Sequence, residues 1–239
     1  MIYSIKMIRL TFKRAVPLVI ALLLIVAIPG VNLEANRPLT LGQEACTSGA
    51  YEVGAQHTIT NYDAGVSGYD QVRTVYTENG SYQTRHVAVR KDYENWVELG
   101  WIARPGQPPK YYVGWHFTNY PYVQMYEWQN APPSTWHTFK IVNNTGSQSD
   151  WEFWVDNQKI PLALGATFDV GLPRAQTRAL SSCDQNGTTW KELRLYIRSY
   201  NLWGYWGQTS PSFDTNPAFY FCPRTNKEFR VNPNAEPCY

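Results

Sequence analysis

The sequence lacks the short motifs that mark the commonest catalytic and metal-binding sites. It has no C-x-x-C pair, and its 4 histidines are dispersed, with neither an H-x-H nor an H-E-x-x-H spacing. It also has no G-x-S-x-G turn of the kind that presents a serine nucleophile. These absences argue against a zinc or redox-cysteine site and against serine or cysteine nucleophilic catalysis. We therefore predict no metal and no cofactor.

Basic charge is also scarce once the N-terminal segment is set apart. Four basic residues between Lys6 and Arg14 precede an apolar run over residues 15–28, which is the pattern of a secretory signal. The run is shorter than the roughly 20 residues of a membrane-spanning helix, although an uncleaved signal would leave an anchor. Cleavage after Ala35 removes four of 21 basic and one of 19 acidic residues, leaving 17 and 18. We expect a secreted protein with no membrane partner after cleavage and no cationic surface for nucleic acid.

All four cysteines lie in the exported part of the chain. An even number of cysteines in an oxidising compartment predicts two disulfides, for which three pairings exist. We favour Cys46–Cys183, which would tie an N-terminal strand to the body of the protein, and Cys222–Cys238, which would tie a proline-rich tail.

After the signal the sequence has no helical periodicity, and short β-rich runs alternate with clusters of Gly, Pro, Asn and Asp. We expect ten strands, at residues 57–62, 70–77, 83–89, 96–103, 110–118, 122–127, 136–142, 151–155, 191–199 and 219–221. Ten short strands favour an all-β sandwich of two antiparallel sheets, of jelly-roll type. The predicted parts are a signal peptide at 1–35, one sandwich domain at 36–221 and a disulfide-tied tail at 222–239.

The predicted strand 96–103 carries one acidic residue among apolar ones. Side chains alternate along a strand, so Val97, Leu99 and Trp101 share one face, which we expect to be core. Glu98 lies on the opposite face. An acid in that position is either a solvated surface residue or a working group in a cleft.

The strand predicted next along the chain adds to that face. Its apolar side should be core, while Tyr112 and His116 point the other way. If the two strands form a hairpin, Glu98, Tyr112 and His116 lie on one outer face. Gly100 and Gly114 would then leave room for a ligand.

Aromatic residues are plentiful, with 10 Trp and 17 Tyr. Aromatic rings stack on the C–H surfaces of sugars, so this composition favours a carbohydrate ligand, although most rings, such as Trp101, Trp115 and Trp151, should be core. A glycine-punctuated aromatic loop at 200–207 either holds a ligand or caps the core. The ligand-binding candidates on the face of Glu98 are Trp96, Tyr112, His116, Gln124 and Tyr126; the last two are assigned there because Val123 and Met125 fit the core side.

Residues 134–141 followed by 151–158 resemble a hairpin common in concanavalin-like lectins and glucanases. The related glucanases carry an E-x-D-x-x-E strand, whereas here Glu98 is followed by Gly100 and Ala103. Retaining glycosidase chemistry needs two carboxyls about 5 Å apart, so we do not expect it through this motif.

A second resemblance covers about residues 85–125. The stretch 96–102, followed by Pro105, residues 111–115 and Tyr120, is similar to the core of neprosin-type proteins. These are secreted double-sheet proteins that are related in fold to the eqolisin glutamic peptidases. The resemblance therefore implies the same fold and, as an expectation, a glutamic peptidase activity.

In that family the glutamate of this strand is one of two catalytic groups, and the resemblance gives the position to Glu98. The second group should lie downstream on a facing strand. Residues 172–180 occupy that place and contain no glutamate, but Gln176 there has the chemistry to orient a carbonyl.

The sequence thus favours a secreted, disulfide-tied jelly roll that recognises an extracellular carbohydrate through an aromatic cleft. The alternative is a neprosin-like glutamic endopeptidase, acting on peptide through Glu98 and a second group. A purely structural envelope protein has no feature in its favour, and no pattern indicates an oligomeric state.

Overall fold

Two antiparallel β-sheets make up the described part of the chain in the computed structural model. The predicted signal over residues 1–35 and three cysteines (Cys46, Cys183 and Cys238) lie outside that part. Cys222 lies within it, buried on a strand, so the pairing of the cysteines stays a prediction. No helix among the described residues is long and apolar enough to cross a membrane. The structure describes residues 48–57, 63–73, 82–181, 187–207, 209–214, 219–225 and 227–233.

The first sheet has seven strands, and its order mixes segments that are far apart in the sequence. In spatial order it contains β13 (Thr209–Asp214), β1 (Ser48–His57), β10 (Leu172–Ser181), β3 (Gln83–Arg90), β4 (Trp96–Ala103), β5 (Lys110–His116) and β6 (Gln124–Asn130).

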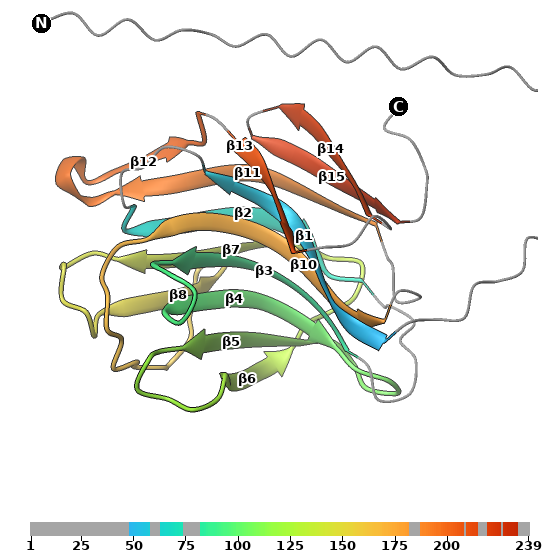
Figure 1. The fold of residues 1–239 in the computed structure, drawn as a ribbon, viewed down its shortest axis with the longest axis horizontal. Helices are drawn as coiled ribbons and strands as arrows, with labels where there is room; N and C mark the ends of the chain where they lie inside the picture. The colour runs from blue at the N-terminus through green and yellow to red at the C-terminus, as the bar shows by residue number, and fades with distance from the viewer. Residues whose placement is uncertain are drawn as a thin grey trace, which may run out of the picture. The chain divides into compact units, whose positions relative to one another are not determined.

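The second sheet has eight strands, one of which extends β11 at the side. In spatial order it contains β14 (Phe219–Thr225), β15 (Glu228–Pro233), β11 (Thr188–Ile197), β2 (Gly65–Gln71), β7 (Trp136–Asn143), β8 (Trp151–Val155) and β9 (Gln158–Lys159), with β12 (Leu202–Tyr205) paired to β11 after a short 3₁₀ turn (Arg198–Tyr200). Figure 1 shows the two sheets as layers, with β10, β3, β4 and β5 in one and β11, β2, β7 and β8 in the other. The all-β double-sheet sandwich is therefore confirmed.

The core lies between the sheets and is built from the inward face of each strand. Val97, Leu99 and Trp101 of β4 are completely buried, as their alternation predicts. Phe139 of β7 and Trp190 of β11 meet them from the second sheet and pack edge to face with centroids 6.3 Å apart. The inner face of each sheet is thus mostly apolar, with Asp70 and Arg85 as buried charged exceptions, and the more polar faces point outward.

Several segments differ from the sequence prediction: β2 runs over Gly65–Gln71 instead of 70–77, of which residues 74–77 lie outside the described part, and β12 and β13 were not predicted as strands. Three further segments differ for a common reason. Residues 172–181 form a full strand, β10, that lies between β1 and β3. The segment expected as a tail begins with a hairpin, β14–β15, whose second strand pairs with β11 over 188–190. The first strand runs over 48–57 instead of 57–62, of which residues 58–62 lie outside the described part. All three segments have interspersed polar or proline residues, which weaken the apolar pattern used to recognise strands.

Candidate functional site

The outward face of the first sheet gathers polar side chains from four adjacent strands. The register pairs Gln176 of β10 with His86 of β3, and Ala88 of β3 with Glu98 of β4. Their sequence neighbours Val87 and Leu99 are wholly buried in the core, so His86 and Glu98 point the opposite way. A single face therefore carries a glutamate, a histidine and a glutamine on three neighbouring strands.

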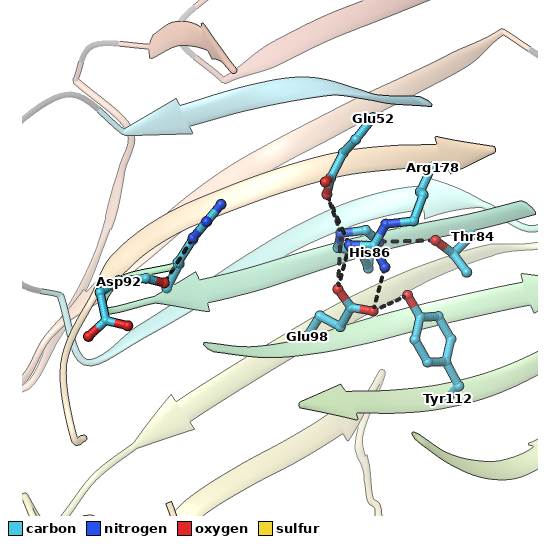
Figure 2. A network of polar contacts seen from close by, with 8 residues as sticks. Glu52, Thr84, His86, Asp92, Glu98, Tyr112 and Arg178 are labelled. Atoms are coloured by element: carbon cyan, nitrogen blue, oxygen red, sulfur yellow. Dashed lines mark hydrogen bonds and ion pairs between the residues drawn. The ribbon is translucent and has the colours of Figure 1, made fainter. Parts of the chain in front are cut away.

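Glu98 is almost enclosed, with 2% of its surface exposed, and it is surrounded by polar groups (Figure 2). The hydroxyl of Tyr112 donates to Oε1 at 3.0 Å. The guanidinium of Arg178 lies 3.4 Å from each carboxylate oxygen, and Nε2 of His86 lies 3.4 Å from Oε2. The buried carboxylate thus has partners on β3, β5 and β10, which offsets the cost of removing it from water.

A second carboxylate, Glu52 of β1, approaches the same two side chains, Arg178 and His86. Its Oε1 lies 3.3 Å from Nη2 of Arg178 and 3.4 Å from Nε2 of His86. Burial alone would raise the pKa of Glu52, but the contacts with His86 and Arg178 outweigh it and lower the pKa to about 2. His86 therefore lies between two carboxylates, and Figure 2 shows both of them directed at its ring.

The pKa values of Tyr112 and Arg178, two neighbours of Glu98, are both raised. Burial lowers the pKa of Arg178, but the adjacent carboxylates Glu98 and Glu52 outweigh it and raise the pKa above its ordinary value. Burial and the charge of Glu98 both raise the pKa of Tyr112. Tyr112 thus stays a neutral hydrogen-bond donor and Arg178 a fixed cation at any ordinary pH.

The carboxylates border a small cavity open to solvent, with a volume of about 160 Å³. Glu52, Glu98, Gln176 and Arg178 all line it, together with Trp96. A carboxylate and a primary amide thus share one solvent-accessible space. This set can activate a water molecule and polarise a carbonyl group.

Glycines of neighbouring strands make room for the side chains of Glu98 and Gln176. A Cβ atom on Gly114 would lie 2.8 Å from Oε1 of Glu98, and one on Gly54 would lie 2.8 Å from Cγ of Gln176. A Cβ on Gly100 would collide with the backbone of Arg85. The expectation that Gly100 and Gly114 leave room for a ligand is therefore wrong: the space is taken by Glu98 and by β3.

The structure brings together only part of the predicted ligand-binding set. Trp96 and His116 share the outward face with Glu98 and stack with centroids 6.4 Å apart. Tyr112 lies on the same face but is wholly buried, with its hydroxyl engaged by Glu98, so its ring offers no open surface for a ligand.

Gln124 and Tyr126 lie on the opposite face from Glu98, contrary to the prediction. They pair with Trp115 and Val113, whose side chains point to the core, and Tyr126 packs against the core cluster. Met125 points outward instead and is 37% exposed. The prediction from hydrophobicity reversed the two faces of β6. The reason is that β6 is an edge strand whose outward face is itself partly apolar.

Glu52, His86 and Arg178 complete the site and were not singled out from the sequence. His86 lies on β3, which was predicted as a strand. For Glu52 and Arg178 a signal exists in the alternation along β1 and β10, which were not predicted as strands at these positions. In β10, Arg174, Gln176 and Arg178 alternate with Ala175, Thr177 and Ala179, and in β1, Glu52, Gly54 and Gln56 alternate with Val53 and Ala55. The described residues contain no group of three or more His, Cys, Asp or Glu suited to a metal ion.

The fold is similar to the double-sheet β-sandwich of the eqolisin glutamic peptidases, in agreement with the resemblance found in the sequence. Scytalido-glutamic peptidase, solved with a peptide-based transition state analogue, matches with a TM-score of 0.60 and 9% identity, over 78% of this chain and 100% of that one. SCP-B, a member of the eqolisin family in complex with the tripeptide Ala-Ile-His, matches with a TM-score of 0.58 and 8% identity, over 78% and 100%.

A concanavalin-like glycoside hydrolase matches more weakly. The endo-β-1,3-glucanase from Pyrococcus furiosus has a TM-score of 0.34 and 12% identity, over 76% of this chain and 72% of that one. No model of a known protein family matches the sequence, and no curated protein matches it either. At these identities the likeness concerns the fold alone.

Proposed function

We propose that the chain is an exported hydrolase of peptide bonds in which Glu98 is the general base and Gln176 polarises the scissile carbonyl. One observation carries the proposal: Glu98 and Gln176, from separate strands of an eqolisin-type sheet, line the same solvent-accessible cavity. The named eqolisin structures hold a peptide-based inhibitor and a tripeptide, which supports a peptide as substrate.

The reaction follows from the groups that line the cavity. Glu98 takes a proton from a water molecule, whose oxygen attacks the carbonyl carbon of the substrate. The amide N–H of Gln176 and the guanidinium of Arg178 stabilise the negative charge on the carbonyl oxygen. Glu98 then returns the proton to the nitrogen as the C–N bond breaks, which releases an acid and an amine.

The contacts of Arg178 are loose enough for such a change of partner. Its 3.3–3.4 Å distances to Glu98 and Glu52 exceed the roughly 2.7–2.9 Å of tight charge-assisted pairs. Catalytic hydrogen bonds in free enzymes are often long and tighten only around the substrate. Arg178 can therefore shift from Glu98 toward a developing oxyanion while it stays paired with Glu52.

The hypothesis of carbohydrate binding has less support on the outward face of the first sheet. Of its five proposed contact residues, Tyr112 is buried and Gln124 and Tyr126 point to the core side. Trp96 and His116 remain, stacked on one another. A cavity lined by two carboxylates and three arginines suits proton transfer and stabilisation of negative charge better than stacking on a sugar ring.

The test compares peptide cleavage by the wild-type chain, Glu98→Gln and Gln176→Ala, using an internally quenched peptide library between pH 2 and pH 7. Glu98→Gln preserves the shape and the acceptor for Tyr112 but removes the base, so we expect a loss of roughly 10²–10⁴ in kcat/KM. Gln176→Ala removes one oxyanion donor, for which we expect a loss of roughly 10²–10³ in kcat.

Glu127→Gln is the matched control. Glu127 is a carboxylate on the same sheet that pairs with Lys110 at 3.0 Å and with Arg104, away from the cavity, so its loss should leave cleavage unchanged. Circular dichroism and thermal unfolding establish that each variant is folded. Absence of cleavage by the folded wild type at every pH would reject the proposal, as would a Glu98→Gln variant with full activity.

A further inference from the structure

The second sheet carries a larger cavity on its own outward face, away from Glu98. Its volume is about 570 Å³, within the range typical of ligand sites, and none of its lining residues lines the cavity of the first sheet. Strands β11, β2 and β7 form its floor, β12 lies on one side and the β8–β9 turn on the other. We refer to it as the second-sheet groove.

The charged side chains of the second-sheet groove are already paired within the protein. Glu192 accepts hydrogen bonds from Arg194 at 3.1 Å and from the Tyr205 hydroxyl at 2.7 Å. Asp156 accepts from the backbone N–H of Thr138 at 2.9 Å and lies 2.8 Å from His137. Two acids and two bases line the groove, so it has no net charge with which to select an ionic ligand.

Lys140, the remaining charged group, is also occupied. Its ammonium lies 4.5 Å from the centre of the Trp154 ring, a cation–π contact. Burial lowers the pKa of Lys140, and the charge of Glu152 opposes that shift. The lysine thus contributes its apolar stem to the groove more than a free charge.

The polar side chains of the second-sheet groove that remain available to a ligand are uncharged. In the part of the chain that the structure describes, the side chains of Ser67, Tyr69, Thr138 and Asn157 make no hydrogen bond to protein, yet all four line the groove. Hydroxyls and an amide offer both donors and acceptors. This is the complement of a ligand rich in hydroxyl groups.

The wall of the groove is held in place before any ligand arrives. Trp203 of β12 packs on Tyr196 with centroids 5.2 Å apart, and β12 is hydrogen-bonded along β11. A bulge in β11, where Glu192 has a positive φ of 52°, directs the Glu192 carboxylate to the Tyr205 hydroxyl. A preorganised aromatic ring beside free hydroxyls loses little entropy on binding.

An extended peptide would find few partners on this floor. Peptides that add to a sheet need an open strand edge, whereas β11, β2 and β7 are each paired on both sides. Only side chains face the ligand, as in a site that reads hydroxyl groups and stacks on C–H surfaces.

We propose that the second-sheet groove binds a neutral oligosaccharide, with Trp203 as the stacking surface and Ser67, Tyr69, Thr138 and Asn157 as hydrogen-bonding partners. The aromatic segment 200–207 supplies the ring, so its role is to hold a ligand. Binding here is independent of the proposed hydrolysis at Glu98 and would attach the protein to a glycan surface near its substrate.

The experiment is isothermal titration calorimetry of the purified chain with uncharged hexasaccharides of glucose, mannose and xylose. We expect at least one to bind. Trp203→Ala should weaken its affinity at least tenfold because the stacking surface is lost, and Thr138→Val should weaken it several-fold because one hydroxyl is lost at nearly constant volume. If Trp203→Ala does not fold, Thr138→Val alone carries the test.

Two controls separate this site from others. Tyr122→Ala removes a 75% exposed ring elsewhere on the surface, and Glu98→Gln disables the proposed hydrolase; both should bind sugar as the wild type does. Absence of binding to every hexasaccharide would overturn the proposal. Binding unaffected by both groove variants would also overturn it, and so would binding confined to uronic acid oligomers or peptides.

Discussion

Arg178 has the central position among the residues of the candidate site. One guanidinium lies within 3.4 Å of two carboxylates that would otherwise repel each other in a largely buried space. Without it, Glu52 and Glu98 would have only the imidazole of His86 between them. Arg178 therefore permits two acids to coexist beside one cavity, which is a costly arrangement for folding and a useful one for proton transfer.

Glu52 gives a prediction for the pH dependence of stability. Its pKa is lowered from 4.5 to about 2, so the folded state favours the carboxylate more than the unfolded chain does. The resulting stabilisation is fully present above pH 4.5 and is lost as the pH falls toward 2. We expect Glu52→Gln to lower the free energy of unfolding by up to about 3 kcal/mol at pH 6, measured by urea denaturation.

At pH 2 the same substitution should cost much less, because the wild-type carboxyl, with its pKa of about 2, is by then about half protonated and most of the stabilisation from the pKa shift is lost. Glu228→Gln is a suitable comparison, since Glu228 pairs with Arg224 at the surface and should have a small effect at both pH values. An equal loss for Glu52→Gln at pH 6 and pH 2 would contradict the assigned ion pair.

Among the elements, β4 and β5 fix the position of Glu98 through a close approach. Because Gly114 of β5 lies opposite Glu98 and has no side chain, the glutamate can lie flat against the neighbouring strand. Gly114→Ala would place a Cβ 2.8 Å from Oε1 and 2.9 Å from Cγ of Glu98. The flexible glutamate side chain should move rather than the backbone.

We therefore expect Gly114→Ala to fold but to lower kcat/KM for peptide cleavage by about 10²-fold, as a displacement of roughly 1 Å does in other active sites. Gly165→Ala is the control, because a Cβ there meets no atom within 4 Å. Thermal unfolding and cleavage rates measured in parallel distinguish displacement of Glu98 from loss of the fold. Full activity in Gly114→Ala would argue against Glu98 as the base.

The same elements indicate how far the sequence predicts the site. Alternation in β4 and β5 correctly assigned Glu98, Tyr112 and His116 to one face, because these strands have an uninterrupted apolar side. It could not assign the partners on β1 and β10. Those strands pair across 126 positions between Glu52 and Arg178, and such pairing is decided by the packing of the whole sandwich.

At the scale of the whole molecule, two opposite buried charges, one on each sheet, interact electrostatically within the apolar core. Asp70 of β2 and Arg85 of β3 are both fully buried, and Asp70 accepts hydrogen bonds from Trp101 at 3.1 Å and Thr188 at 2.8 Å. Burial raises the pKa of Asp70 and lowers that of Arg85 to about 10, and each charge opposes the shift of the other. The pair thus spans the interface between the layers that carry the two proposed sites.

This pair should show strong coupling in a double-mutant cycle. Asp70→Leu leaves the buried cation of Arg85 without its carboxylate, so we expect a loss of about 3–5 kcal/mol in the free energy of unfolding. Asp70→Leu combined with Arg85→Met removes both charges and should recover most of that loss. The part not recovered is the free energy of the hydrogen bonds that Trp101 and Thr188 donate to Asp70. The half-exposed pair Arg198–Asp169, at 2.7 Å, is the matched control, with an expected coupling below about 1 kcal/mol. Urea denaturation of the four chains of each cycle measures both couplings, and additive effects at Asp70 and Arg85 would mean that the sheets are held together by apolar packing alone.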